Sequence, residues 1–423
     1  MASYITKRWV SEATSGMPRS ERRSCEYHAY LPDRLADRVF RLDGDVAADV
    51  ADAEAAIAKL DGRAGALTDT EALARMLLRA ESVASSRIEG LEVGPRRLMR
   101  AEAARQMGEG VADVGAEEIL GNIDAMGAAL QVASDGRDLT TDDLFEIHRC
   151  LMTNTRLSKY AGNRREVQNW VGGNVYNPCA ATYVPPPPDK VDALLEDLCE
   201  FCNSDMLPAI AQAAIAHAQF ETIHPFVDGN GRVGRALIHL ILRRRGLAKQ
   251  VLPPVSLILA TRAADYVSGL TGYRYDGDAS SAEAHDGANR WIASFAAACV
   301  RAVSDAFEFE ERCEQIEAEW RSRLGRIRSG SSTDLLVRSL PGMPIISVKS
   351  ATAALGRSKP QVNEAVARLV DAGILKQVTV GRRNRAFEAI EIIDAFANLE
   401  RQLASLEGDT RAAPRARSVP GRR

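Results

Sequence analysis

The sequence predicts a mainly α-helical protein with a small winged helix-turn-helix domain near its C-terminal end. Aromatic residues make up only 5% of the 423 residues, while alanine, leucine and arginine, which favour helices, are abundant. Apolar residues recur at helical spacing through most of the chain. Strand-like patterns are short and lie near the two ends.

The overall charge and the distribution of apolar residues limit which partners this chain can have. A formal net charge of -3 gives no overall attraction to nucleic acid, so any such binding requires a local basic patch. The chain has no run of about eighteen apolar residues, and its first residues lack the apolar core of a signal peptide. We therefore expect a cytoplasmic protein without a membrane partner.

Seven cysteines follow no regular spacing, which predicts reduced thiols. Cys199 and Cys202 form a C-x-x-C pair in a helical pattern, but no second pair or histidine cluster accompanies them. We expect buried helix thiols here rather than a metal or redox site.

The N-terminal part is predicted to be an accessory region followed by a helix. Residues 1–64 contain short strand-like pieces and an alanine-rich helical segment at about 45–61. The next helix is predicted over residues 68–90, where Thr68 is a suitable N-cap and Gly90 a suitable terminator.

The centre of the chain is predicted to be helical apart from one long loop. Helical periodicity returns at about 116–134 and 141–154, whereas residues 159–189 carry a four-proline run and cannot form one regular element. Residues 208–223 have the pattern of a buried, alanine-rich helix, and residues 231–245 that of the helix after it. A short connection joins these two helices.

The remaining chain is predicted to contain, in order, two helical segments over 255–300, a helical connector over 301–330, a winged-helix-like domain over 331–400 and a basic, disordered tail over 401–423. Within the winged-helix-like domain, helices at 348–355 and 359–372 precede a strand pair around 381–385. This order of elements indicates a winged helix-turn-helix.

The connection at residues 224–235 reads HPFVDGNGRVGR and combines groups suited to phosphate chemistry. His224 is the only nearby side chain whose usual pKa suits proton abstraction near neutral pH. Asp228 is a candidate Mg²⁺ ligand, because magnesium at phosphate sites takes one or two carboxylates and completes its shell with substrate oxygens. The Gly-Asn-Gly run at 229–231 can turn backbone N–H groups inward as an anion nest.

Two arginines extend this phosphate site. Arg232 and Arg235 are three residues apart and share the first turn of the helix. Their guanidinium groups are planar forks that hold phosphate oxygens more rigidly than a lysine would.

This stretch resembles the H-x-F-x-[D/E]-G-N-G-R-x-x-R signature of the Fic family, and every fixed position matches. Eight fixed positions rarely match by chance in one chain. The resemblance extends over about residues 65–300 and implies a Fic-type helical core with a β-hairpin flap. It further implies transfer of AMP from ATP to a Ser, Thr or Tyr hydroxyl of a target protein, the chain itself included.

The resemblance also assigns roles to individual residues. His224 would be the catalytic base, and Asp228 would hold Mg²⁺ across the α- and β-phosphates. Tyr266 lies in a segment similar to one near the nucleotide base in the family, although Val267 departs from the family pattern. The nucleotide-binding positions are Gly229, Asn230, Gly231, Arg232, Gly234, Arg235 and Tyr266. The histidines for which packing in the core is the favoured interpretation are His148, His217 and His239.

Two further segments resemble parts of the Fic family. Gly172, Gly173, Tyr183 and Val184 match the two ends of the substrate flap, which aligns a target segment by main-chain pairing. An ordinary proline-stiffened surface loop is the alternative interpretation.

Upstream, Ser85 and Glu89 match the inhibitory [S/T]-x-x-x-E-[G/N] motif of class II members. There Glu89 would pair with Arg235 and withhold it from the γ-phosphate. The alternative interpretation is a solvated helix glutamate.

The predicted function is therefore a protein adenylyltransferase that is autoinhibited by Glu89, with Mg²⁺ as cofactor and ATP as co-substrate. Two alternatives stay open: removal of AMP or use of another nucleotidyl or phosphoryl donor on the same scaffold, and a nucleotide-sensing regulator that binds DNA. Residues 331–395 would dock DNA or protein, and protein docking is slightly favoured by the near-neutral charge. Homodimer formation is also left open.

Overall fold

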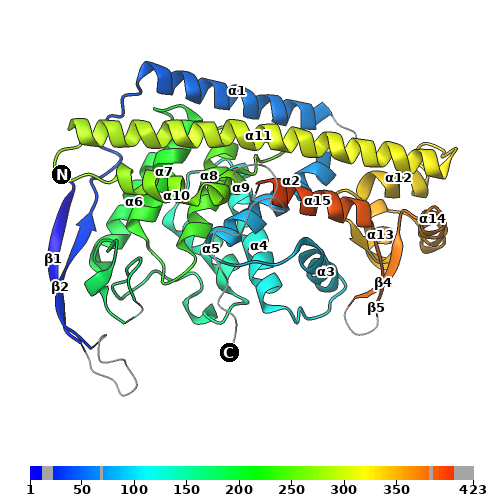
Figure 1. Ribbon diagram of the computed structural model, residues 1–423, viewed down its shortest axis with the longest axis horizontal. Coiled ribbons are helices and arrows are strands. Elements are labelled where there is room, and N and C mark those ends of the chain that lie inside the picture. Colours follow the sequence, from blue (N-terminus) through cyan, green and yellow to red (C-terminus); the bar gives the residue numbers. More distant parts are fainter. Residues whose placement is uncertain (12–21, 67–69, 175, 381–383, 404–423) are drawn as a thin grey trace. The chain divides into compact units, whose positions relative to one another are not determined.

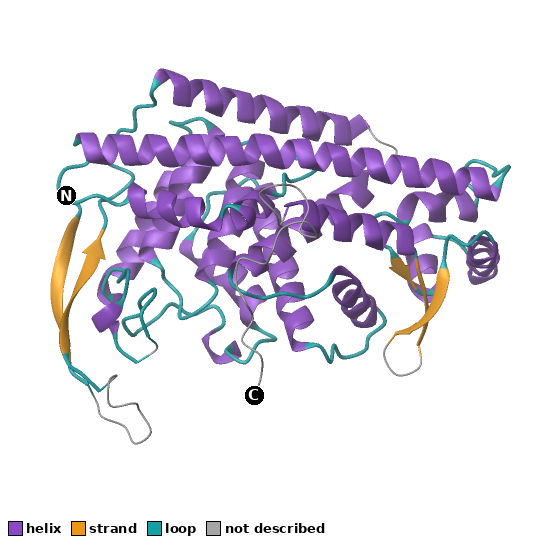
Figure 2. Ribbon diagram, viewed as in Figure 1, coloured by secondary structure: helices purple, strands orange, loops and turns teal. Residues whose placement is uncertain are grey.

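The computed structural model describes residues 1–11, 22–66, 70–174, 176–380 and 384–403. Helices make up most of the described chain, which confirms the mainly α-helical prediction (Figure 2). The chain forms two compact units, each assembled from three stretches. The first unit comprises Met1–Glu54, Asp124–Leu247 and Ala264–Ala297, and the second Ala55–Ile123, Ala248–Ala263 and Ala298–Arg423.

The first unit is built around helix α7 (Ala209–Ile223), which is buried along nearly its whole length. Helices α6 (Val191–Asn203) and α8 (Asn230–Arg244) pack against it. The close approach of α7 and α8 requires Gly234, because a Cβ atom there would lie 2.7 Å from Glu221 Oε1 and 3.0 Å from the Phe220 ring. The other helices of this unit are α5 (Thr141–Met152) and α10 (Ala263–Tyr273).

Four helices contribute residues to both units, namely α1 (Gly44–Ala66), α4 (Val114–Ser134), α11 (Ala282–Leu324) and α10, of which only Ala263 belongs to the second unit. Helix α11 is a single unbroken helix and passes through residue 300, where the predicted core ends and the predicted connector begins (Figure 1).

An antiparallel hairpin of β1 (Ser3–Trp9) and β2 (Cys25–Leu31) opens the chain, as the strand-like pieces predicted. The backbone N–H of Tyr30 in β2 donates to the carbonyl oxygen of Val184 at 2.9 Å, so this hairpin lies against the end of the long loop.

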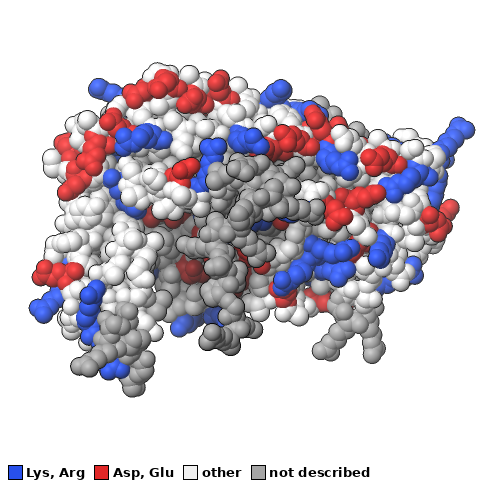
Figure 3. All heavy atoms as spheres, in the orientation of Figure 1, with Lys and Arg blue, Asp and Glu red and all other residues white. Residues whose placement is uncertain are grey.

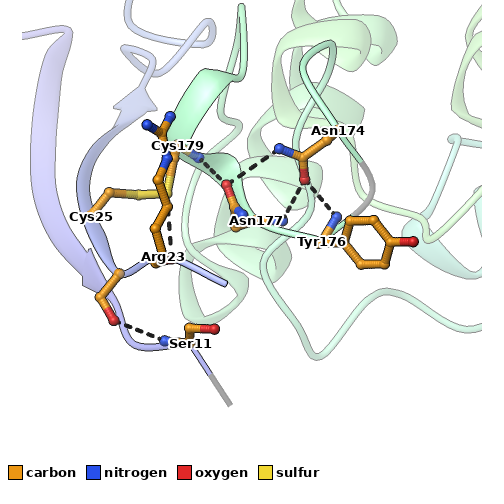
Figure 4. Close-up of a disulfide and its surroundings, with 8 residues drawn as sticks. Ser11, Arg23, Cys25, Asn174, Tyr176, Asn177 and Cys179 are labelled. Carbon is orange, nitrogen blue, oxygen red and sulfur yellow. Dashed lines mark hydrogen bonds between the residues drawn. A yellow bond between two sulfur atoms is a disulfide. The ribbon is translucent and has the colours of Figure 1, made fainter. Parts of the chain in front are cut away.

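A disulfide joins Cys25 of β2 to Cys179 in the short 3-10 turn η3 (Pro178–Ala180), with 5.7 Å between the Cα atoms (Figure 4). The prediction that the cysteines are reduced thiols is therefore wrong for this pair, because chain folding brings together two cysteines that are 154 residues apart in the sequence. Cys199 and Cys202 are free and buried in α6, which confirms the prediction for them.

The N-terminal part of the second unit is helical. Its helices are α2 (Thr70–Ile88), α3 (Pro95–Gln106) and α9 (Val255–Thr261). Gly90 follows α2 with a φ of 83°, as expected for a terminator. The predicted N-cap Thr68 lies outside the described residues, and α3 was not predicted.

Helix α2 also carries a buried carboxylate that caps α9. Glu81 is fully buried, accepts a hydrogen bond from the backbone N–H of Ser256 at 2.8 Å, and binds the Ser256 hydroxyl. This contact satisfies a free N–H group in the first turn of α9.

The C-terminal part of the second unit follows the predicted order of elements. Helices α12 (Ser332–Ser339), α13 (Val348–Leu355) and α14 (Lys359–Asp371) precede strands β4 (Lys376–Val380) and β5 (Asn384–Glu388). Strand β3 (Ile345–Ile346) completes an antiparallel sheet of order β3-β5-β4, and α15 (Ile390–Leu403) ends the described chain. Residues 381–383 of the predicted wing and the tail beyond 403 lie outside the described residues. None of the described helices is both long and apolar enough to span a membrane.

Candidate active site

The candidate site lies on the connection between α7 and α8. His224 follows the last residue of α7 and adopts a left-handed conformation with φ 50° and ψ 60°. Among the described residues it is the one non-glycine with a positive φ. Such a conformation costs about 1–3 kcal/mol and persists only where surrounding contacts impose it.

Arg165 supplies several of those contacts. It is fully buried in the long loop, and its guanidinium donates to the carbonyl oxygens of His224 at 2.8 Å and Ile223 at 3.4 Å. The same group donates to the carbonyl of Pro186, and the Arg165 backbone N–H donates to the carbonyl of Pro225 at 2.9 Å. Burial lowers the pKa of Arg165 to about 10, so it remains charged near neutral pH. Arg165 therefore fixes the backbone on both sides of His224.

The side chain of His224 is accessible to a reactant. It is 21% exposed, and its Nδ1 lies 3.8 Å from a carboxylate oxygen of Glu221, one turn earlier in α7. A carboxylate at this distance stabilises the protonated imidazole that forms when a histidine accepts a proton. Glu221 was not predicted, because its only signal in the sequence is its place three residues before the candidate base.

Phe226 of the connection packs against His148 of α5. The His148 ring stacks on Phe226 with centroids 3.7 Å apart and an interplanar angle of 4°. Its Nδ1 accepts a hydrogen bond from the Gly162 N–H, so the 3.1 Å contact between its Nε2 and the carbonyl of Asp228 is a donation from Nε2–H. Burial lowers the pKa of His148 to about 4, which keeps the ring neutral. His148 is a packed residue, in line with the favoured interpretation, and it positions Asp228.

The side chain of Asn230 binds the backbone of Phe226, four residues earlier in the same connection. Its side-chain oxygen accepts from the Phe226 N–H at 2.8 Å, and its side-chain nitrogen donates to the Phe226 carbonyl at 2.9 Å. The Asn230 side chain is thus used to shape the loop. Its backbone N–H, at the start of α8, remains in the position where an anion binds.

Arg232, in the first turn of α8, has guanidinium N–H groups that bind no other described residue. The residue is 3% exposed, and its Nη2 lies 3.1 Å from Asp228 Oδ2. Its Nε and Nη1 have no hydrogen-bond partner among the described residues. Buried donors without a partner are costly, and an anionic ligand would satisfy them. Gly229, with φ 82°, brings the backbone to this point, where a Cβ atom would lie 2.8 Å from Leu151.

A buried polar group joins α8 to α7 and α10. It consists of Arg235, His217 and Tyr266. Arg235 is 1% exposed, and its Nη1 lies 3.5 Å from the hydroxyl of Tyr266. That hydroxyl is also 2.9 Å from His217 Nε2. Burial, reinforced by the charge of Arg235, lowers the pKa of His217 to about 3, so His217 is neutral. The predicted place of Tyr266 near a nucleotide base stays a prediction, and in this structure its hydroxyl contacts Arg235 and His217.

Asp228 is the residue best placed to hold a cation. Its side chain is 49% exposed and already carries the contact to Arg232. No cluster of three or more His, Cys, Asp or Glu side chains suited to a metal occurs in the described part of the chain. A single carboxylate beside phosphate-binding donors fits Mg²⁺, which takes its remaining ligands from phosphate oxygens and water.

Of the four predicted flap residues, Tyr183 forms an isolated antiparallel bridge, and its partner is Val171, the residue before Gly172. The Val171 N–H donates to the Tyr183 carbonyl at 2.8 Å, and the Tyr183 N–H donates to the Val171 carbonyl at 3.2 Å. Gly172 and Gly173 follow with φ values of 77° and 72° and are exposed. Val184 is buried and pairs with β2 through its carbonyl, as described above.

The flap segment also reaches the connection between α7 and α8. Asn169, two residues before Val171, donates to the Phe226 carbonyl at 3.0 Å and the His224 carbonyl at 3.4 Å. The Tyr183 hydroxyl donates to the carbonyl of Thr222 in the last turn of α7. The structure thus brings the flap segment and the signature together.

The two predicted inhibitory residues lie at the end of α2 in the second unit. Ser85 is fully buried, and Glu89 follows the helix and is exposed. Asn122 of α4 fixes this helix end by donating to the Ser82 carbonyl at 2.8 Å and to the Ser86 hydroxyl at 3.1 Å. The backbone around Glu89 is held by the Leu91 N–H, which donates to the Ser86 carbonyl at 3.0 Å.

Comparison with known families gives two matches. Residues 138–242 match the Fic/DOC family, and residues 47–131 match the N-terminal domain described for the same family. The first match contains the long loop, α7, the connection and most of α8.

Individual relatives are similar over part of their length. The protein adenylyltransferase fic-1 of Caenorhabditis briggsae is 34% identical over 140 residues, which is 32% of this chain and 25% of that protein. Its Caenorhabditis elegans counterpart is 35% identical over 134 residues, 31% of this chain and 23% of that protein. The protein adenylyltransferase Fic of Drosophila melanogaster is 33% identical over 119 residues, which is 27% of this chain and 22% of that protein. The chain thus spans about a quarter of the length of these curated relatives.

A solved structure shares the fold more broadly. The crystal structure of a Fic family protein from Desulfovibrio desulfuricans G20 superposes with a TM-score of 0.50 at 20% identity, covering 83% of this chain and 97% of that one. At this identity the likeness concerns the fold alone.

Proposed function

The chain carries a Fic/DOC domain together with the N-terminal domain of that family, and we propose that it transfers AMP from ATP to a hydroxyl group of a protein. The observation that carries the proposal is the arrangement at the start of α8. Arg232, with two buried donors that lack partners, lies beside the exposed carboxylate of Asp228 and a few residues after the accessible imidazole of His224.

In the proposed reaction His224 takes the proton from the target hydroxyl. The hydroxyl oxygen then forms a bond to the α-phosphorus of ATP, the bond from that phosphorus to the bridging oxygen breaks, and pyrophosphate leaves. Glu221 would stabilise the imidazolium during this step, because its carboxylate lies 3.8 Å from His224 Nδ1.

The phosphates would be bound by the first turn of α8. The backbone N–H groups at 229–231 and the free donors of Arg232 suit the α- and β-phosphates. Arg235 would bind the γ-phosphate, with its position set by Tyr266. Asp228 would hold Mg²⁺, which screens the phosphate charge when bound.

Autoinhibition by Glu89 is part of the proposal. The end of α2 is fixed through Ser82 and Ser86, so Glu89 is presented on a defined turn. Its carboxylate would compete with the γ-phosphate for the guanidinium of Arg235. Replacing Glu89 with glycine should therefore relieve the inhibition.

The test is intact-mass analysis after incubation with Mg·ATP. Glu89→Gly is compared with the wild type, with Glu89→Gly/His224→Ala, and with Glu92→Gly, which removes an exposed glutamate three residues further on. We expect a gain of one or more AMP masses in Glu89→Gly only. Labelling that survives His224→Ala would refute the assigned base, and equal labelling of wild type and Glu89→Gly would refute the autoinhibition.

For the C-terminal elements we propose protein docking. The exposed face of α14 carries Lys359 and Arg368 but also Glu364 and Asp371, so its charges balance. Acidic and basic side chains are interspersed over the visible face of the molecule (Figure 3). A DNA-binding helix needs a net basic surface. Binding of a random-sequence duplex that weakens steeply with salt would contradict this proposal.

A further inference from the structure

A pocket of about 380 Å³ lies within the second unit, and its lining includes none of the residues of the candidate active site. Its walls come from the first turns of α2, from the middle of α11 and from the region of α12. Nothing in the proposed reaction uses it. Half of the residues that α11 contributes to its lining are glutamates.

Three glutamates of α11 line this pocket, namely Glu310, Glu314 and Glu317. Their spacing of four and three residues places them on one face of the helix. The lining also includes two arginines, Arg321 and Arg338.

The charges around the pocket do not cancel. Arg321 is paired with Glu317 at 2.6 Å and with Asp334 at 2.8 Å, and Arg338 is paired with Asp334 at 3.2 Å. Glu310 and Glu314 share one further arginine, Arg63, at 3.1 and 3.9 Å. Four carboxylates therefore face three guanidinium groups, which leaves one negative charge.

Glu310 is the least exposed of the three glutamates that line the pocket. Its side chain is 5% exposed, and its Oε1 has no hydrogen-bond partner among the described residues. Burial raises the pKa of Glu310, as expected for a carboxylate with too little solvation. A cationic group in the pocket would supply the missing partner.

The pocket lining also includes apolar side chains. Leu73 and Met76 of α2, Phe309 of α11 and Pro341 belong to it. A lining that combines apolar side chains with a carboxylate suits a ligand that has a hydrocarbon body and one charged end, because each part can be buried against its own kind of surface.

We propose that this pocket binds a small organic monocation, an ammonium group carried on an alkyl or aryl body. The ammonium lies against Glu310 and Glu314, and the hydrocarbon body lies against Leu73, Met76 and Phe309. The ligand touches the helix whose last turn carries Ser85 and which Glu89 follows.

The probe is hexylammonium chloride, titrated into the full-length protein by calorimetry at about 0.15 M ionic strength. A probe of this size should bind saturably with a Kd on the order of 1 mM. Hexanoate, with the same chain and the opposite charge, should not bind.

The variants locate the site. Glu310→Gln and Glu314→Gln should each weaken binding at least fivefold, roughly 1 kcal/mol or more. Glu311→Gln, an exposed position on the same helix outside the pocket lining, should leave the Kd within about twofold. Thermal unfolding without ligand verifies that each variant is folded, and Glu314 is the safer position because it is exposed.

Three results would overturn the proposal. The first is no saturable binding of hexylammonium up to about 20 mM. The second is equal affinity in the wild type and in both pocket variants. The third is hexanoate binding as tightly as hexylammonium, since the pocket would then not select for positive charge.

Discussion

The guanidinium of Arg165 donates a hydrogen bond to the carbonyl oxygen of His224 at 2.8 Å. This contact joins the long proline-rich loop to the one non-glycine residue with a left-handed backbone in the described chain. The conformation of the candidate base is therefore imposed from outside the signature. An arginine is required there because one side chain must donate to several carbonyl groups in different directions.

Arg165→Lys should reduce catalysis without weakening ATP binding. A lysine keeps the charge but cannot reach the carbonyls of His224, Ile223 and Pro186 together. In the Glu89→Gly background we expect kcat for automodification to fall by about 10- to 100-fold, with KM for ATP changed less than about threefold. Arg164→Lys, which alters a partly exposed ion pair with Asp192, is the control. An unchanged kcat would show that Arg165 does not position His224.

Arg232→Lys should weaken ATP binding. The substitution removes the planar fork whose Nε and Nη1 lack partners. Loss of two charge-assisted hydrogen bonds should raise the Kd for ATP at least about tenfold. The check is equilibrium binding of ATP, with Arg244→Lys at the other end of α8 as the control. Equal ATP affinity in the two variants would mean that Arg232 does not bind phosphate.

His148 should make the protein less stable in mild acid. Its pKa is about 4 in the folded state against 6.5 for the unfolded chain, so the unfolded state binds more protons between these values. The contribution of His148 is fully present above pH 6.5 and is lost as the pH falls towards 4. Between pH 6 and 5 the free energy of unfolding should fall by about 1.2 kcal/mol more in the wild type than in His148→Gln.

Urea unfolding at several pH values measures this difference. Other buried groups, including His217, occur in both proteins and cancel in the comparison. Parallel pH profiles for the two proteins would be inconsistent with a neutral, buried His148.

Removal of the disulfide should destabilise the first unit. The bond closes a loop over a sequence separation of 154 residues, for which chain entropy predicts a contribution of up to about 5 kcal/mol. Cys25→Ser/Cys179→Ser should unfold at lower temperature than the wild type and lose any response to reductant. Cys150→Ser, at a free cysteine, should keep that response. Peptide mapping without reductant that finds Cys25 and Cys179 unlinked would contradict the pairing.

Gly234→Ala should be destabilising although alanine favours helices. The new methyl group would lie 2.7 Å from Glu221 Oε1 and 3.0 Å from Phe220. Overpacking of this kind costs about 1–3 kcal/mol. Gly127→Ala in α4, where a Cβ atom meets nothing within 4 Å, should instead stabilise by about 0.5–1 kcal/mol. Chemical denaturation of both variants tests the contrast.

The helices could be predicted because their signals are local. Residues 348–355 were predicted to the residue, and the helices on either side of the signature were predicted to within one residue at each end. Helix α3 was missed, since only Pro95 marks its start. The Cys25–Cys179 pairing could not be predicted, because nothing near either cysteine indicates a partner so distant in sequence.

The signature could also be predicted from local sequence, whereas the residues that hold it in place could not. Residues 224–235 are contiguous, so their chemistry is visible in the sequence. Arg165, His148 and Glu221 act through contacts that form only when the chain folds, and each is a common residue type in an unremarkable local pattern. The contacts of the Tyr266 hydroxyl with His217 and Arg235 likewise form only on folding and have no signal in the sequence.

The discontinuous first unit has a consequence for synthesis on the ribosome. Trp291, which donates from its ring nitrogen to the carbonyl of Ala214 at 2.7 Å, belongs to the last of the three stretches of that unit. Translation proceeds at about 5–20 residues per second, so α7 waits several seconds for this partner after it is made. During that interval an apolar helix lacks part of its cover, and a nascent chain in this state is a natural client for chaperones.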